Sequence, residues 1–133
     1  MCDTCALIWM VNNSKLNTEN REKLNESYQM GYHTYISPIT AWELGMLAAY
    51  GRIRLASPVT KWFDEYVKYG NYRLAEMSPR ILIGSSYLPD LPKSDPADRI
   101  IIATARFLNL QIVTRDRTIL RYAEKGYVRA MHC

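Results

Sequence analysis

Apolar residues recur at helical spacing in several segments of the chain, and many of these segments open with a Ser-Pro or Asp-Pro pair. Proline suits the first position of a helix, and a preceding Ser or Asp can cap it. Four helix starts are predicted in this way, at Ser37-Pro38, Ser57-Pro58, Ser78-Pro79 and Asp95-Pro96. The predicted helices are Pro38 to about Tyr50, Pro58 to about Tyr69, Pro79 to about Ser86 and Pro96 to about Leu108.

Short apolar runs lie between these helices and have the composition of strands. They are Tyr35-Ile36, Tyr72 to Leu74, Leu110 to Thr114 and Val128 to Ala130. Two further helical segments precede them, a helix end at Leu7 to Val11 and a polar helix from Thr18 to about Met30. Strands that alternate with helices predict an α/β fold, with a short parallel sheet of about four to five strands sandwiched by helices. Because no linker or repeat interrupts the pattern, we expect one domain over residues 1–133.

The three tryptophans fall within apolar helical patterns, so each is predicted to anchor the core and not to stack on bases. They are Trp9, Trp42 and Trp62. Two segments could supply an apolar interface, the face formed by Trp62, Tyr66 and Tyr69 and the helix from Leu44 to Leu47.

The composition indicates an ordinary globular domain and disfavours a membrane-spanning or secreted protein. The chain has 133 residues, of which 48% are hydrophobic and 23% charged, as in ordinary globular domains. No apolar run approaches the roughly 20 residues that span a bilayer, and the start, Met1 to Cys5, lacks the basic segment of a secretory signal. A cytoplasmic location is therefore expected.

The three cysteines cannot all pair within one chain, so free thiols are expected. Cys2 and Cys5 lack the second ligand pair of a zinc site.

Carboxylates recur near the ends of predicted strands, where ligands bind in open α/β sheets. The four acids are Asp3, Glu43, Asp98 and Asp116. If they converge, they repel one another unless cations lie among them. A cluster of acids without a histidine partner favours Mg²⁺ or Mn²⁺. Thr4, Ser37 and Thr114 place hydroxyl groups beside these acids, where they could orient ligands or water.

Four segments that contain these acids resemble, in order and spacing, the signature segments of PIN-domain ribonucleases, most closely the VapC-type toxins of bacterial toxin–antitoxin pairs. The segments are Asp3-Thr4-Cys5-Ala6-Leu7-Ile8-Trp9, Ser37-Pro38-Ile39-Thr40-Ala41-Trp42-Glu43, Asp95-Pro96-Ala97-Asp98-Arg99 and Thr114-Arg115-Asp116-Arg117. The resemblance includes Gly51-Arg52-Ile53 after the second segment, the Pro58 helix and the closing Val128 strand.

This resemblance implies a PIN fold and a metal-dependent endoribonuclease that inhibits growth as a toxin. Its catalytic, metal-binding acids would be Asp3, Glu43, Asp98 and Asp116. The implied cofactor is Mg²⁺ or Mn²⁺ and the implied substrate is RNA. The resemblance also implies a homodimer and a VapB-type antitoxin whose C-terminal segment lies across the active-site groove.

The charge of the chain is compatible with an RNA substrate. Its net charge is +4 with a pI near 9.0, and with the four acids neutralised by metal the balance becomes 17 basic against 9 acidic residues, or +8. Arg99, Arg115 and Arg117 flank two of the motifs and are candidates for phosphate contacts. Arg99 has an alternative role, an ion pair with Asp98 or Asp95.

Several other interpretations remain open at this point. Taken singly, Asp116 could cap the helix that follows it, and Glu43 could be a solvated helix residue. Family members usually carry several apolar residues before the first aspartate, whereas this chain has Met1 and Cys2, so we expect a very short central strand. A chain impaired in this way would bind RNA or an antitoxin without cutting. A phosphatase-like domain with Asp3 as nucleophile is disfavoured, because the D-x-D-x-T pattern fails at Cys5.

Overall fold

A parallel β-sheet lies at the centre of the computed structural model, which describes residues 1–11, 18–91 and 94–133. Its strands are β1 (Tyr35–Ile36), β2 (Arg73–Leu74), β3 (Gln111–Thr114) and β4 (Arg129–His132). β1 pairs with β2 and β3 pairs with β4, both in parallel. The predicted strands are confirmed: β2 and β3 each begin one residue later than predicted, and β4 begins one residue later and ends two residues later.

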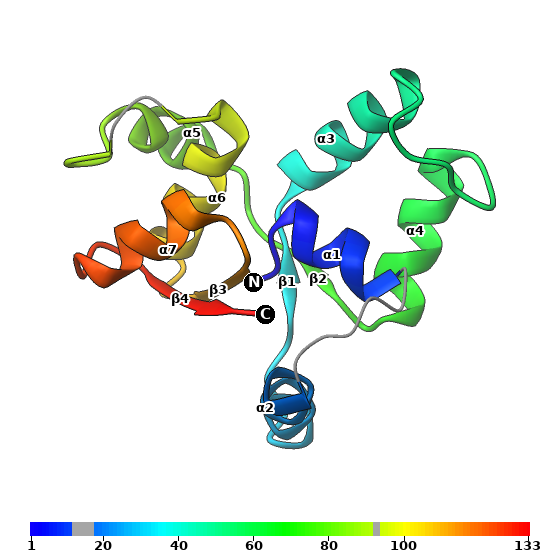
Figure 1. Cartoon of the computed structure of the whole chain (residues 1–133), viewed down its shortest axis with the longest axis horizontal. Coiled ribbons are helices and arrows are strands. Elements are labelled where there is room, and N and C mark those ends of the chain that lie inside the picture. The colour runs from blue at the N-terminus through cyan, green and yellow to red at the C-terminus, as the bar shows by residue number, and fades with distance from the viewer. Residues whose placement is uncertain (12–17, 92–93) are drawn as a thin grey trace.

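The first residues of the chain join these two pairs into one sheet. Cys2 forms parallel bridges to Ile36 on one side and to Val113 on the other. The Cys2 N–H donates to the Tyr35 carbonyl at 3.0 Å, and the Val113 N–H donates to the Met1 carbonyl at 2.8 Å. Figure 1 shows the N-terminus between β1 and β3. The expectation of a very short central strand is confirmed, and strand order reverses there, at the position where open α/β sheets bind ligands.

Seven helices are found in the described ranges, and their predicted positions hold to within a few residues. They are α1 (Thr4–Val11), α2 (Thr18–Gln29), α3 (Pro38–Ala49), α4 (Val59–Tyr69), α5 (Pro79–Ser86), α6 (Pro96–Phe107) and α7 (Arg117–Glu124). Figure 1 shows α5, α6 and α7 grouped beside β3 and β4, and α1, α3 and α4 beside β1 and β2. The α/β architecture is confirmed. None of the helices in the described ranges combines the length and apolarity needed to cross a bilayer.

The predicted helix caps are correct at two of the four positions. The Ser37 hydroxyl accepts the N–H of Ile39 at 3.4 Å, and Asp95 Oδ1 accepts the N–H of Ala97 at 2.8 Å. Ser57 is not a cap: Pro58 has an extended ψ of 138°, so α4 begins one residue later at Val59. Ser78 occupies the N-cap position of α5, but its side chain makes no capping hydrogen bond.

The core prediction for tryptophan is wrong at one position. Trp9 and Trp62 are half-buried and pack against core clusters, whereas 57% of Trp42 is exposed. On α3 the buried side chains are Thr40 and Leu44, and residues two positions apart on a helix do not share a face. Trp42 therefore points away from the core, and the buried Leu44 is not available as an interface residue.

The three cysteines are free thiols, as predicted. Cys2 and Cys133 are buried, and Cys5 is exposed. Cys2 and Cys133 belong to the core cluster that also contains Ala6 and Val113. Two of the thiols therefore serve the packing of the sheet, and the third faces outward from the first turn of α1.

Candidate active site

Asp3 and Thr114 meet at the carboxyl ends of the central strands. Asp3 directly follows Cys2 and is 4% exposed, and Thr114 is the last residue of β3. The Thr114 hydroxyl donates to Asp3 Oδ2, and Asp3 Oδ1 accepts the N–H of Ala6 at 2.5 Å. Both oxygens of this carboxylate are therefore held by groups that fix its orientation.

Asp116 is held in place by the start of the helix that follows it. Its Oδ1 accepts the N–H groups of Thr118 at 2.7 Å and Ile119 at 3.0 Å, so Asp116 does cap α7. Its own N–H donates to the hydroxyl of Thr114 at 2.8 Å. Capping uses Oδ1, so the cap does not require Oδ2. One hydroxyl, that of Thr114, thus connects two of the predicted acids.

Glu43 is positioned by Thr4, which in turn contacts Thr40. The Thr4 hydroxyl hydrogen-bonds to Glu43 Oε2 and lies 3.1 Å from the hydroxyl oxygen of Thr40. Thr40 is fully buried and was not predicted as a site residue. A signal existed in the sequence, because Thr40 precedes Glu43 by three positions and therefore shares its helix face. Ser37, the remaining predicted hydroxyl, is buried at the N-cap of α3.

Burial and nearby carboxylates raise the pKa values of Asp3, Glu43 and Asp98. Burial and then the charges of Asp116, Asp95, Glu43 and Asp3 raise the pKa of Asp98 to about 7. Burial is also the largest cause of the raised pKa values of Asp3 and Glu43, and nearby carboxylates raise them further. Every charged neighbour that shifts these three pKa values is itself a carboxylate. The structure thus places the four predicted acids within electrostatic reach of one another, and Asp95 joins them.

Cys5 lies among the same charges. Its thiol pKa is raised to about 11, first by burial and then by Asp3, Glu43, Asp98 and Asp116. Cys5 was not predicted as a site residue, although it lies two residues after the first acid.

The chemistry of these donors fits a hard cation. Carboxylate and hydroxyl oxygens are the ligands that Mg²⁺ and Mn²⁺ prefer, and negative charges that repel one another favour a cation between them. In the described part of the chain, no three His, Cys, Asp or Glu side chains lie close enough to hold a metal ion. Mg²⁺ does not require such a group, because it is usually held by one or two carboxylates and retains several waters.

The three arginines predicted to contact phosphate differ in their surroundings. Arg99 donates to the carbonyls of Ser85 at 2.9 Å and Ser86 at 3.2 Å, at the C-terminal end of α5. The Arg115 guanidinium lies 4.3 Å from the centre of the Trp9 ring, and its Nε donates to the Cys133 carbonyl. Arg117 is exposed in the first turn of α7. Two of these arginines therefore have structural contacts, whereas the third faces solvent beside Asp116.

Comparison with known proteins identifies the family of the chain. The sequence model of a family described as "PIN domain" matches residues 1–125. The chain is also 34% identical over 84 residues to Ribonuclease VapC22 of Mycobacterium tuberculosis (strain ATCC 25618 / H37Rv). That alignment covers 63% of this chain and 63% of the relative, so the match spans less than two thirds of the curated protein.

Proposed function

This chain belongs to the PIN domain family, and from that premise we propose that it is a metal-dependent endoribonuclease that hydrolyses RNA phosphodiester bonds. The observation that carries the proposal is the gathering of Asp3, Glu43, Asp98 and Asp116 where the strand order reverses, with Asp98 at a pKa of about 7. Its similarity to a protein named a ribonuclease supports the same reaction.

In this proposal the four acids form the site for Mg²⁺ or Mn²⁺: Asp3 and Asp98 would be direct ligands, and Glu43 and Asp116 would complete the site directly or through water molecules. A divalent ion at such a site supplies positive charge that stabilises the attacked phosphate and activates a water molecule. Thr114 keeps Asp3 oriented, and Thr4 keeps Glu43 oriented. Asp98 is partly protonated near pH 7 without a cation and becomes ionised when a cation offsets its carboxylate neighbours.

Arg117 is the strongest of the three candidates for phosphate contact, because it is exposed beside Asp116. Arg99 uses its Nε and Nη2 groups for the carbonyls of α5, which leaves further N–H donors for RNA. Arg115 is held against Trp9 and the Cys133 carbonyl and would contact RNA with its remaining donors. We keep all three as phosphate ligands in the proposal, with Arg117 first.

The similarity to a VapC ribonuclease supports a biological role as well. We propose that the protein is the growth-inhibiting toxin of a toxin–antitoxin pair, that it acts in the cytoplasm, that a VapB-type antitoxin binds it, and that it forms a homodimer. The PIN domain in this proposal extends to residue 133, because β4 pairs with β3 along its whole length, beyond the matched residues 1–125.

One observation favours a second candidate function. Because the central strand is very short, with Cys2 as its bridged residue, a module that binds RNA or an antitoxin without cutting is the alternative. The two functions predict opposite results in a cleavage assay.

The experiment is cleavage of total cellular RNA with Mg²⁺ or Mn²⁺, compared with EDTA and with the Asp98→Asn variant. Asp64→Asn is a matched control, because Asp64 is an exposed acid on α4 outside the site. We expect metal-dependent cleavage that Asp98→Asn abolishes and Asp64→Asn preserves. Cleavage retained by Asp98→Asn would contradict the assigned site, and no cleavage with either metal would favour the binding module.

A further inference from the structure

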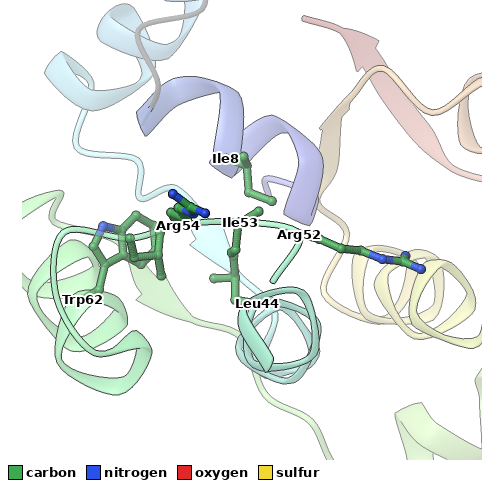
Figure 2. Close-up of a pocket in the computed structure, with 7 residues that line it drawn as sticks. Ile8, Leu44, Arg52, Ile53, Arg54 and Trp62 are labelled. Carbon is green, nitrogen blue, oxygen red and sulfur yellow. The ribbon is translucent and has the colours of Figure 1, made fainter. Parts of the chain in front are cut away.

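A pocket of about 240 Å³ lies between α1, α3, α4 and the segment that connects the last two helices. Figure 2 shows Ile8 reaching from α1 toward Ile53, Leu44 on α3 close by, and Trp62 at the α4 side. The connecting segment also contributes Leu55 and two arginines, Arg52 and Arg54. The pocket therefore combines apolar walls with two positive charges and does not include the four site acids.

The indole of Trp62 belongs to a column of stacked rings. The Trp62 and Tyr66 rings have centres 5.1 Å apart and planes 10° apart, and Tyr66 and Tyr72 follow at 5.0 Å and 14°. The hydroxyls of Tyr66 and Tyr72 lie 3.1 Å apart. The column connects α4 to the residue before β2, so the Trp62 ring is held in one orientation at the pocket. A fixed aromatic surface of this kind suits a flat ligand, because little freedom is lost on binding.

The two arginines are exposed at different distances from this aromatic surface, Arg54 next to it and Arg52 beyond Ile53. Figure 2 shows Arg54 beside Trp62 and Arg52 extending in the opposite direction. Both belong to the connection between α3 and α4, and the side chains of both are exposed. Guanidinium groups in this position fit an occupant that carries negative charge at two points along its length.

The pocket is close to the candidate active site along two elements. Leu44, in its wall, directly follows Glu43 on α3. Ile8, in the opposite wall, is four residues after Thr4 on α1, a rise of about 6 Å along the helix. Since Thr4 hydrogen-bonds to Glu43, the pocket begins one helical turn from the acids.

We propose that this pocket binds a base of single-stranded RNA close to the cleaved phosphodiester, with the base packed against Trp62 and with Arg52 and Arg54 contacting the flanking phosphates. The proposal rests on the proposed ribonuclease function and specifies how the substrate is positioned. An RNA single strand offers the flat ring and the pair of negative charges that the pocket combines. Trp62, which was predicted from the sequence as a core anchor and not as a base-stacking residue, is then also a positioning residue for the reaction, and the acids remain the catalytic groups.

The test measures binding without cleavage. A short single-stranded RNA with one 2-aminopurine in place of a purine is titrated with the protein in EDTA, with the fluorescent base at each position in turn. Stacking on an aromatic ring quenches 2-aminopurine. We expect quenching at one position, about a tenfold weaker affinity with Trp62→Leu, and loss of the quenching in that variant.

Matched variants separate the pocket from general effects. Trp42→Leu removes an exposed tryptophan outside the pocket, and Arg73→Gln removes an exposed arginine on β2. Both are expected to bind RNA as the unmodified protein does. Arg52→Gln and Arg54→Gln are each expected to reduce the slope of log affinity against log salt concentration by about 1. Because both arginines are exposed, these two variants test the proposal even if Trp62→Leu unfolds the protein.

The outcomes also distinguish this proposal from the proposed function. Unchanged binding and quenching in all three pocket variants would overturn the inference, and the pocket would then be free for another occupant, such as an apolar side chain of a protein partner. Failure of the unmodified protein to bind any of the RNAs would overturn it as well. Loss of binding in the variants, together with no cleavage by the unmodified protein under any metal, would support the subsite and contradict the nuclease.

Discussion

The hydroxyl of Thr114 donates to the carboxylate of Asp3 across 111 positions of the chain. The same oxygen accepts the N–H of Asp116, so one side chain links the end of the central strand to the start of α7. Because Thr114 is the last residue of β3, pairing of the sheet and orientation of Asp3 depend on each other.

Thr114→Val is expected to weaken metal binding by about 10- to 100-fold, because partners that orient metal ligands have effects of that size. The hydrogen bond lowers the pKa of Asp3, so its removal raises that pKa further. Titrating the metal dependence of RNA cleavage measures the effect. Thr60→Val is a suitable control, since Thr60 is exposed on α4. An unchanged metal requirement in Thr114→Val would show that Asp3 does not depend on this hydroxyl.

The pH dependence of stability is expected to follow Asp98. Its pKa is raised to about 7 in the folded chain, from an ordinary value of 3.8, so folding favours the protonated form. This contribution is present in full below about pH 4 and is lost as the pH rises through 7. Metal-free protein is therefore expected to melt at lower temperatures as the pH is raised from 5 to 8, and Mg²⁺ or Mn²⁺ is expected to reverse the decrease.

The Asp98→Asn variant separates this effect from other titrations. It removes the carboxyl group, so its melting temperature in EDTA is expected to change less between pH 5 and 8 than that of the unmodified protein. Equal pH dependence of the two proteins in thermal melts would contradict the assignment to Asp98.

Asp116 caps α7 and also carries a negative charge at the candidate site. Two substitutions distinguish the effects of these two properties. Asparagine retains the oxygen that accepts the N–H groups of Thr118 and Ile119, whereas alanine removes it. Asp116→Asn is expected to lose RNA cleavage with little change in stability, and Asp116→Ala is expected to lose about 1 kcal/mol of stability in addition. Denaturant unfolding and the cleavage assay measure the two effects. Full activity in Asp116→Asn would restrict this residue to capping.

Loss of the Arg117 side chain is expected to affect RNA binding, whereas loss of the Arg99 side chain is expected to affect stability. Arg117→Gln is expected to weaken RNA binding and leave the melting temperature unchanged, because Arg117 is exposed. Arg99→Gln removes hydrogen bonds to the Ser85 and Ser86 carbonyls and is expected to cost about 1 kcal/mol of stability. Thermal melts and RNA titrations of both variants test this. A lower melting temperature for Arg117→Gln would show that it too has a structural contact.

Features that depend on neighbours in the sequence could be predicted well. Ser37 and Asp95 were recognised as caps because a cap and the N–H group it accepts lie two residues apart. The capping interpretation of Asp116 was correct for the same reason. The prediction failed at Ser57, where an extended Pro58 starts the helix one residue later, a choice that the Ser-Pro pair does not determine.

Features that depend on distant contacts could not be derived in this way. An ion pair of Arg99 with Asp98 or Asp95 was considered from the sequence, whereas its donors reach the carbonyls of Ser85 and Ser86, 14 and 13 residues away. Trp42 has an apolar helical context but lies on the exposed side of α3. The gathering of the four acids depends on strand order, which residue spacing does not determine, and was foreseen through the resemblance to a family.

The bridges from Cys2 to Ile36 and Val113 have a consequence for how activity is lost. These two contacts join the β1–β2 half of the sheet to the β3–β4 half, and the next residue is Asp3. Breaking the bridge between Cys2 and Val113 would divide the sheet and would at the same time separate Asp3 from Thr114. An intermediate with the two halves parted would therefore lack the proposed nuclease activity, and loss of the sheet and loss of that activity would coincide.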